Sequence, residues 1–357
     1  MAHNFLRRVK AIKQTRNPPT LADVAREAGF SLTTASRVLN GGASVSKAKA
    51  DKIQEVISRL DYRPNALARG LKARKTAAIG VIVSNPSDPC TAHAIKAVLE
   101  TAHTRGYVVI LASSGGYPEI ERAEIKNLIS RRVDGLLIAP VDGRNAHFMN
   151  IPFSGLPVVA FGQPIRNPLF DGVTIANRRG AREATRHLLD HGYRRIIALG
   201  VHPRLPACSE RVAGYREALK RVSLEPRLCL AEHESMLASD WLSEAVFEKH
   251  NADAILCLNW VTTALLLRAL RQLRKKPGRD VPILSCEDFE LADMLTPGIS
   301  AVRQPAERLG YEAARLLFER LNGEASKQQV SLVLPTELIL RGSCGCSDLP
   351  NPSKYHR

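Results

Sequence analysis

The spacing of hydrophobic positions changes near residue 78, and this change predicts two parts. Before it, apolar residues recur every three or four positions, which is typical of amphipathic helices. After it, short continuous apolar runs alternate with stretches of helical spacing, the pattern of a parallel sheet with helices on both faces. We therefore expect a small helical N-terminal part followed by a large α/β body.

The N-terminal part begins with two short helices joined by a tight turn. Leu21, Val24 and Ala28 share one helical face, with Thr20 as the N-cap, and Ser31 can cap the second helix. Helices joined this closely must cross at a steep angle, as in a helix-turn-helix. One face of the second helix then remains open to a partner outside the fold, and it carries Leu32, Thr33, Thr34, Ser36 and Arg37.

A third helix completes the predicted core of the head. Ser46 is placed to cap it, and Ile53, Val56 and Leu60 line one face. The segment 65–72 follows and is only two helical turns long. Because isolated helices shorter than about 12 residues are marginal in water, we expect this segment to become helical only when a partner holds it.

Seven short apolar runs predict buried parallel strands in the body, at 79–83, 107–112, 135–140, 157–161, 195–200, 253–258 and 281–285. This is a doubly wound α/β arrangement, and its length suggests two sheets. Ligands of such folds bind at the carboxyl ends of the strands. Polar or turn residues stand at several of these ends, at Ser84–Asn85, Gly162–Gln163, Asn259–Trp260 and Glu287–Asp288.

The charge distribution favours a nucleic-acid partner for the head. The 357 residues include 51 Lys and Arg against 35 Asp and Glu, a formal net charge of +16. Residues 1–78 alone hold 16 basic and 5 acidic side chains, so +11 of the excess lies there. Basic charge around a helix-turn-helix is what a polyphosphate selects, because each neutralised phosphate releases condensed counterions.

Membrane, disulfide and catalytic signals are weak. No apolar run reaches the roughly 18 residues of a membrane helix and none resembles a signal peptide, so we expect a cytoplasmic protein. The seven cysteines lack zinc-ligand spacing and are interpreted as free thiols. Cys344 and Cys346 form the only close pair. We favour an exposed tail there, with a redox or metal role as the alternative, and predict no metal, no cofactor and no enzyme activity.

A series of motifs resembles the lactose/galactose repressor family between about Pro19 and Gly345. The head TLADVAREAGFSLTTASRVLN, the hinge YRPNALARGLK and the body motifs RRVDGLLIAP, GLPVV, ADAILCLN, TPGISAVRQPAERLG and LPTELILRGS follow in family order. The resemblance implies a homodimeric regulator that binds a pseudo-palindromic operator and has a periplasmic-binding-protein-like body of two subdomains. It implies a basic arm (1–18), a DNA-binding head (19–62), a hinge (63–76), an effector-binding body (77–345) and a tail (346–357).

The resemblance also assigns DNA contacts. Leu32 and Thr33 become base-reading positions, and Arg37 reaches a guanine edge, a contact that discriminates by about 1–3 kcal/mol. Thr34, Ser36 and Asn40 are expected at phosphates. In the hinge, Asn65 and Ala68 match the minor-groove face, Leu71 matches a wedge between base pairs, and Lys72 adds positive charge. For the basic arm we favour disorder, with extra phosphate contacts as the alternative.

For the effector, the resemblance and the strand ends point to Asp88, Cys90, Gln163, Arg182, Ser209, Arg211, Asn259, Trp260 and Glu287. Several acids that bind sugar hydroxyls in the family are absent. Because Arg182 stands at a family arginine position and Trp260 is gained, we predict an anionic or ring-bearing effector, although Asn and Gln alone could hold a neutral sugar. Arg182 could instead form a surface salt bridge, Trp260 could pack in the core, and Arg211 could brace the cleft.

Other classes of function remain to be weighed. Repression is the family default, and activation is the alternative within the family. A solute-binding transport protein would share the body fold but have an export signal and no DNA-binding head. A sugar-modifying enzyme would need converging acid, base or nucleophile groups, and the sequence shows no such spacing. Since no leucine-rich helix follows Arg341, we expect a dimer rather than a tetramer.

Overall fold

The computed structural model divides into two compact units, residues 1–76 and 77–357. It describes residues 19–39, 45–62, 75–142, 151–153, 155–163, 170–237, 242–326 and 328–346. The basic arm (1–18) and the predicted contact residues Asn40, Asn65, Ala68, Leu71 and Lys72 lie outside the described residues.

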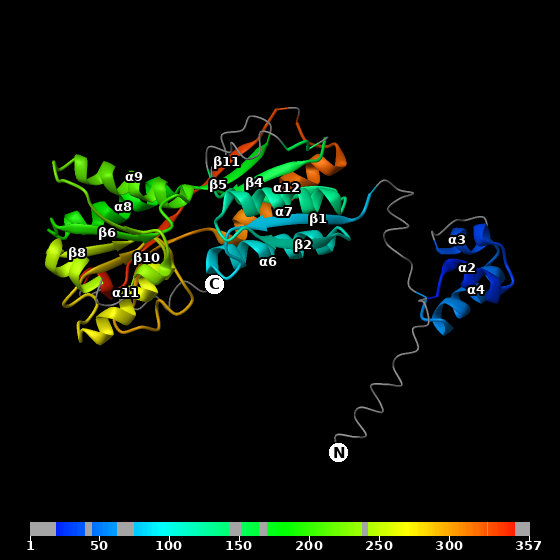
Figure 1. Ribbon diagram of the computed structural model, residues 1–357, viewed down its shortest axis with the longest axis horizontal. Helices are drawn as coiled ribbons and strands as arrows, with labels where there is room; N and C mark the ends of the chain where they lie inside the picture. The colour runs from blue at the N-terminus through cyan, green and yellow to red at the C-terminus, as the bar shows by residue number, and fades with distance from the viewer. Residues whose placement is uncertain are drawn as a thin grey trace, which may run out of the picture. The chain divides into compact units, whose positions relative to one another are not determined.

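The described part of the head contains three helices, α2 (Leu21–Ala28), α3 (Leu32–Leu39) and α4 (Lys47–Arg59) (Figure 1). They pack around a buried cluster of Val24, Ala28, Ile53 and Val56. The predicted three-helix core is therefore confirmed.

Local capping fixes the turn between α2 and α3. Thr20 and Asp23 form a reciprocal capping box at the start of α2, and Gly29 ends that helix with φ +75°. The Thr34 amide donates to the Ser31 hydroxyl over 3.2 Å, so the predicted cap of α3 is confirmed. Ser46 occupies the N-cap position of α4, but its side chain accepts no capping hydrogen bond, and that part of the prediction is wrong.

The first subdomain of the body has a six-stranded sheet in the order β11-β5-β4-β3-β1-β2, with all neighbouring strands parallel. The strands are β1 (Ala78–Val83), β2 (Val108–Ser113), β3 (Gly135–Ile138), β4 (Val158–Gly162), β5 (Asp171–Ile175) and β11 (Ser331–Leu334). The helices are α6 (Pro89–Thr104), α7 (Pro118–Ser130) and α12 (Ala306–Asn322).

The second subdomain has a sheet in the order β12-β10-β9-β8-β6-β7, in which only β12 runs antiparallel to its neighbour. The strands are β6 (Ile196–Val201), β7 (Arg227–Ala231), β8 (Ala254–Cys257), β9 (Ile283–Ser285), β10 (Ser300–Arg303) and β12 (Glu337–Ile339). The helices are α8 (Asn177–Asp190), α9 (Pro206–Lys220) and α11 (Trp260–Gln272), with short turns η2 (Glu234–Met236), η3 (Ser243–Lys249) and η4 (Gly342–Cys344).

Alternating side chains of the central strands explain why both sheets are covered on two faces. In β1, Ile79 and Val81 join the core beneath α6 and α12, while Ile82 faces the core beneath α7. In β6, Ala198 packs toward α8 and α9, and Leu199 packs toward α11. The doubly wound α/β fold with two sheets is confirmed.

Two glycines allow the closest helix packing in the body. A Cβ on Gly214 of α9 would lie 2.1 Å from the Arg178 carbonyl oxygen of α8, and one on Gly310 of α12 would lie 2.0 Å from the Ala94 carbonyl oxygen of α6. Each subdomain therefore pairs two helices at a distance that no larger residue permits.

The chain crosses between the subdomains three times, after β5, after β10 and after β11 (Figure 1). All seven predicted strands are present, but β5, β7, β10, β11 and β12 are additional. The prediction that β2 is buried is wrong, because this strand forms an edge of its sheet, where Val108 is 61% exposed and Leu111 is 45% exposed.

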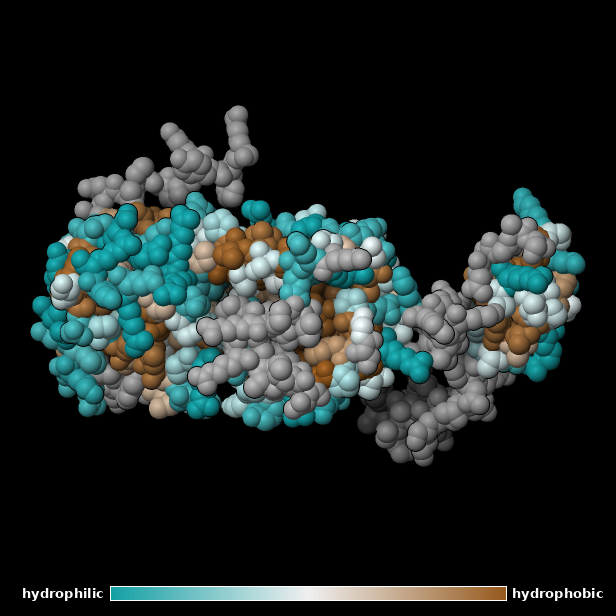
Figure 2. Space-filling model, turned by 90° about the horizontal axis from the view of Figure 1, so that it is seen from above, coloured by the Kyte–Doolittle hydropathy of each residue, from teal (hydrophilic) through white to brown (hydrophobic). Residues whose placement is uncertain are grey.

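Polar residues cover much of the visible surface, with apolar patches between them (Figure 2). In the parts of the chain that the structure describes, no helix combines the length and apolar character needed to cross a bilayer.

A candidate DNA-reading helix and an effector cleft

Helix α3 presents an open face from the head. Leu32, Thr33 and Arg37 are exposed, whereas Thr34 and Ser36 are half-buried. Ala35 is the buried residue of this helix. An exposed leucine beside threonine and arginine is suited to contact a partner, because an arginine can bind a base edge and apolar groups can contact a thymine methyl group.

The charges of the described head leave Arg37 available to a partner. Arg26 pairs with Asp23, and Arg59 pairs with Glu27 over 2.9 Å. Among the carboxylates of the described head, none forms an ion pair with Arg37. The exposed guanidinium can therefore bind a base or a phosphate without first breaking an internal ion pair.

The body contains a polar cavity of about 130 Å³ between its two subdomains. Asp88 and Gln163 line it from the first subdomain, and Arg211, Asn259, Trp260 and Glu287 line it from the second. These residues follow the ends of β1, β4, β8 and β9 or lie on α9. The structure thus brings together six of the nine candidate effector residues.

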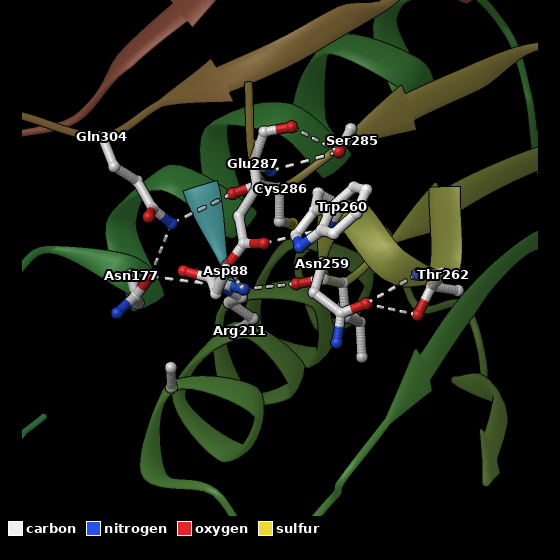
Figure 3. A network of polar contacts seen from close by, with 12 residues as sticks. Asp88, Asn177, Arg211, Asn259, Trp260, Thr262, Ser285, Cys286, Glu287 and Gln304 are labelled. Atoms are coloured by element: carbon white, nitrogen blue, oxygen red, sulfur yellow. Dashed lines mark hydrogen bonds and ion pairs between the residues drawn. The ribbon is translucent and has the colours of Figure 1, made fainter. Parts of the chain in front are cut away.

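A buried ion pair forms the floor of this cavity. The Arg211 Nη1 atom lies 2.7 Å from Glu287 Oε1, and both residues are almost fully buried. Arg211 also donates to the Asn177 side chain over 3.0 Å and to the Leu258 carbonyl over 2.5 Å (Figure 3). Its charge is therefore already compensated inside the protein.

The second oxygen of Glu287 anchors α11. It accepts a hydrogen bond from the Trp260 backbone amide over 2.9 Å. Burial raises the pKa of the Glu287 carboxyl, and the nearby Arg211 guanidinium only partly opposes this shift. Glu287 thus joins the ion pair to the helix that carries the tryptophan.

Asn259 and Ser285 hold the surrounding turns. The Asn259 Oδ1 atom accepts from the Thr262 amide over 2.9 Å, which caps α11 and leaves the amide nitrogen to donate to a ligand. The Ser285 hydroxyl donates to the Glu287 carbonyl over 2.6 Å. These contacts fix the cavity's polar groups before any ligand binds (Figure 3).

Trp260 supplies a donor without an acceptor. Its indole Nε1 atom is buried and has no hydrogen-bond partner among the described residues, while the residue lines the cavity. Buried donors are almost always satisfied by protein, water or a ligand, so this N–H stands out among the groups of the cavity lining.

Two glutamine side chains connect the parts of the body. Gln163, after β4, accepts a hydrogen bond from the Ala207 amide at the start of α9 over 2.7 Å, which joins the subdomains across the cleft. Gln304, on the crossing segment after β10, donates to Asn177 over 3.4 Å and to the Cys286 carbonyl over 3.3 Å. Groups at the cavity therefore contact segments that set the arrangement of the two subdomains.

The structure places three candidate residues outside this cavity. Arg182 pairs with Glu217 over 3.3 Å and lines a separate hollow between α8 and α9. Ser209 is exposed, and its hydroxyl donates to the Pro206 carbonyl. The surface salt bridge considered for Arg182 is the arrangement found, and neither residue is placed to contact a ligand in the cleft.

Cys90 lines a neighbouring cavity of about 510 Å³ with Asp288 and Arg303. Burial raises the pKa of its thiol well above the ordinary value of 9.0, so the thiol is neutral. His202 and Cys208 line the effector cavity but were not predicted. His202 follows the predicted strand 195–200, so the rule of strand ends could have found it.

The expectation of an exposed tail at the close cysteine pair is wrong for Cys344. This residue is buried and Cys346 is half-buried, and both pack against α8. Burial would raise the pKa of the Cys344 thiol, but hydrogen bonds with His187, Ser300 and Cys346 lower it to about 7.

Each of the two units contains a region that matches a known protein family. Residues 20–65 match the family of bacterial regulatory proteins, lacI family, and residues 185–344 match the periplasmic binding protein-like domain.

Full-length relatives agree. The chain is 30% identical over 339 residues to the HTH-type transcriptional repressor PurR of Vibrio parahaemolyticus, covering 91% of this chain and 98% of that protein. It is 30% identical over 326 residues to catabolite control protein A of Staphylococcus epidermidis, with the same coverage of both chains.

Solved structures show the same fold. The lac repressor dimer bound to operator and the anti-inducer ONPF has a TM-score of 0.81 at 24% identity, covering 92% of this chain and 99% of that one. The complex of the transcriptional regulator CelR with cellobiose has a TM-score of 0.64 at 29% identity, covering 91% and 99%. Together with the exposed face of α3, these matches show that the chain belongs to the lacI family of bacterial regulatory proteins and is a DNA-binding transcriptional repressor.

Proposed function

We propose that this repressor acts in the cytoplasm as a homodimer on a pseudo-palindromic operator, and that a small effector in the cleft changes its DNA affinity. The open face of α3 supports DNA reading through Leu32, Thr33 and Arg37. The buried, unpartnered indole N–H of Trp260 carries the effector proposal, because it lies at a cavity whose other polar groups are already organised.

The charge of the cavity favours a neutral effector. Arg211 is compensated by Glu287, and Asp88 adds a second carboxylate to the lining. Arg182, on which the anionic prediction depended, pairs with Glu217 elsewhere. The proposal therefore keeps the ring-bearing effector and replaces the anionic group with hydroxyl groups.

A neutral, hydroxyl-rich ring such as a sugar matches the available groups. The Asp88 carboxylate can accept from hydroxyls, whereas the Asn259 amide and the Trp260 indole can donate to them. The apolar face of a sugar ring can also pack on an indole. The cellobiose bound by the related regulator CelR is a ligand of this chemical class.

Exposed apolar side chains support the dimer. Val108 and Leu111 lie on the edge strand β2, and Leu99, Tyr117 and Ile120 lie on or next to the helices α6 and α7 that contact this strand. A second copy of the chain would remove this surface from water. Sedimentation of the Val108→Lys variant at low concentration should show monomers, and an unchanged dimer would exclude this surface.

A thermal-shift screen with operator binding tests the effector. Neutral sugars, sugar acids, phosphosugars and nucleobases would be added to the full chain. We expect a neutral sugar to raise the melting temperature and to change operator affinity. Trp260→Phe, which keeps a ring but removes the N–H, should weaken that ligand by about tenfold, the effect of one hydrogen bond.

Arg182→Ala is the matched control for charge. It should leave the affinity for the neutral sugar unchanged, because this guanidinium lies outside the cleft. Stabilisation by a phosphosugar that is lost in Arg182→Ala would contradict the proposed site and return the effector to the surface near α8.

A further inference from the structure

Four side chains with soft or borderline donor atoms meet at the C-terminal end of α8. His187 Nε2 lies 3.3 Å from Cys344 Sγ and 3.6 Å from Cys346 Sγ. The two sulfur atoms are 3.2 Å apart, and His191 Nε2 lies 3.2 Å from Cys346 Sγ. The cluster lies outside the effector cavity, and none of its members lines that cavity.

Local structure presents both histidines on one side. His187 and His191 are four positions apart at the last turn and C-cap of α8, so their rings are neighbours and pack edge to face with centroids 4.6 Å apart. The His191 ring also stacks on Tyr193 at an interplanar angle of 17°. The helix and the Tyr193 ring thus hold two imidazoles whose Nε2 atoms both approach the Cys346 sulfur.

Gly345 brings the two thiols to the same point. It has φ +90°, a left-handed conformation that suits glycine, and this turns the chain between Cys344 and Cys346. A Cβ at this position would lie 2.4 Å from the Tyr193 hydroxyl oxygen, so a larger residue could not occupy it without moving that ring. The Cys-Gly-Cys sequence is therefore built into the packing of the subdomain.

The distances among His187, Cys344 and Cys346 are close to those of three corners of a tetrahedral metal site. Zinc bonds of about 2.3 Å to sulfur and 2.0–2.1 Å to nitrogen place the donor atoms of a tetrahedron about 3.3–3.8 Å from one another. His187, Cys344 and Cys346 have all three of their donor separations between 3.2 and 3.6 Å, while His191 approaches only Cys346, over 3.2 Å. Two thiolates and two imidazoles are also the donor set that zinc favours over magnesium or calcium.

We propose that His187, Cys344 and Cys346 bind one Zn²⁺ ion in a structural site, and that His191, already next to Cys346, turns in as the fourth ligand. Four protein ligands complete a tetrahedral shell and leave no position for a substrate, which separates this site from a catalytic one. The metal joins the end of α8 to the C-terminal segment of the described chain. Since that segment includes Ser343, which accepts from the Ser300 amide over 2.8 Å, the ion would stabilise the packing of this segment on β10.

Metal content of the full chain is the first test. Protein purified under reducing conditions with zinc, and then desalted, should contain about one zinc ion per chain. Cys346→Ser and His191→Asn should lose most of it, because each removes one ligand near the surface. Cys90→Ser and His103→Asn are matched controls outside the cluster and should keep it.

Cobalt substitution and chelation give independent readouts. Co²⁺ at this site should show the intense visible bands of a tetrahedral ion and thiolate charge-transfer bands, and both should vanish in the Cys344→Ser/Cys346→Ser variant. A chelator should lower the melting temperature of the wild-type chain but not that of the double variant.

Several results would overturn the proposal. These are reduced wild-type protein without zinc, equal zinc in the variants and the wild type, or an octahedral cobalt spectrum. If the oxidised chain forms a stable Cys344–Cys346 disulfide and the reduced chain binds no zinc, the pair would be assigned to redox chemistry instead.

Discussion

The face of α3 and the effector cleft are both polar, but they are built in different ways. In the head, the hydrogen bonds Thr20–Asp23 and Ser31–Thr34 join residues three positions apart, although the Arg59–Glu27 ion pair connects α4 to α2. In the cleft, Arg211 reaches Glu287 across 76 positions, and Gln304 reaches Asn177 across 127. The head's polar face is thus a product of local sequence, and the cleft is a product of the fold.

Burial makes the energetic consequences different. An exposed group on α3 is hydrated before and after folding, so its removal changes binding more than stability. A group in the cleft has lost its hydration, and the loss of its partner leaves a buried charge or donor unsatisfied. Cleft substitutions should therefore destabilise the body, whereas substitutions on α3 should act mainly on DNA.

The largest expected effect comes from breaking the buried ion pair. Arg211→Met leaves Glu287 buried without its partner and should lower the free energy of unfolding of the body by about 3–5 kcal/mol. Urea unfolding of the full chain, followed by a probe in the body, measures this change.

The double variant Arg211→Met/Glu287→Leu sharpens the test. It removes both charges and should be more stable than Arg211→Met alone. Arg179→Ala, which breaks the exposed pair with Glu183, is the control and should change stability little. A double variant as unstable as the single one would mean that packing, not charge, dominates at this position.

Asp288 should have the next largest effect. It binds Arg341 through two hydrogen bonds of 2.8 and 3.0 Å and also pairs with Arg303 over 2.9 Å. Asp288→Asn should cost about 1.5–3 kcal/mol of unfolding free energy, the range for hydrogen bonds to charged groups. Because these arginines follow β12 and end β10, the loss should appear in the second subdomain.

The same residue gives a pH prediction. Burial would raise the pKa of Asp288, but Arg341 and Arg303 outweigh it and lower the pKa below its ordinary value of 3.8. The carboxylate thus contributes stability above pH 3.8, and the contribution is lost as the pH falls through the lower folded-state pKa. The stability difference between wild type and Asp288→Asn should shrink on acidification, and a constant difference would contradict this origin.

On the head, Arg37→Ala should weaken operator binding by about 1–3 kcal/mol and affect random DNA much less. The melting temperature should not change, because the side chain is exposed. Fluorescence anisotropy with both DNA types at one salt concentration measures the ratio. Equal losses on both would identify Arg37 as a phosphate contact.

The smallest effect is expected at the cap of α2. Thr20→Ala removes the side-chain half of the capping box and should cost the head about 1 kcal/mol. Ser46→Ala is the matched control, since the Ser46 side chain makes no capping hydrogen bond and its loss should cost less. Thermal unfolding of the head followed by helical circular dichroism compares them, and equal losses would show that the cap bond of Thr20 contributes nothing.

Strand prediction succeeded where apolar runs were long and failed where polar residues interrupt them. The run 79–83 is buried on both faces of its sheet, so its composition identifies it. Strand β5 was not predicted from the sequence, because it begins with the non-hydrophobic residues Asp171 and Gly172. Asp171 can be buried there because Arg320 binds it over 2.7 and 2.8 Å, and that partner is 149 positions away.

The sequence by itself determined the helix-turn-helix, its open polar face, the alternation of strands and helices, and the strand ends where the cleft forms. These features follow from spacing, caps and turn residues within a few positions of each other. The tertiary structure decided that Arg211, not Arg182, enters the cleft, and that the two histidines of α8 meet Cys344 and Cys346. Both outcomes depend on which helix faces pack against one another, and residues more than 100 positions apart carry no local signal of that choice.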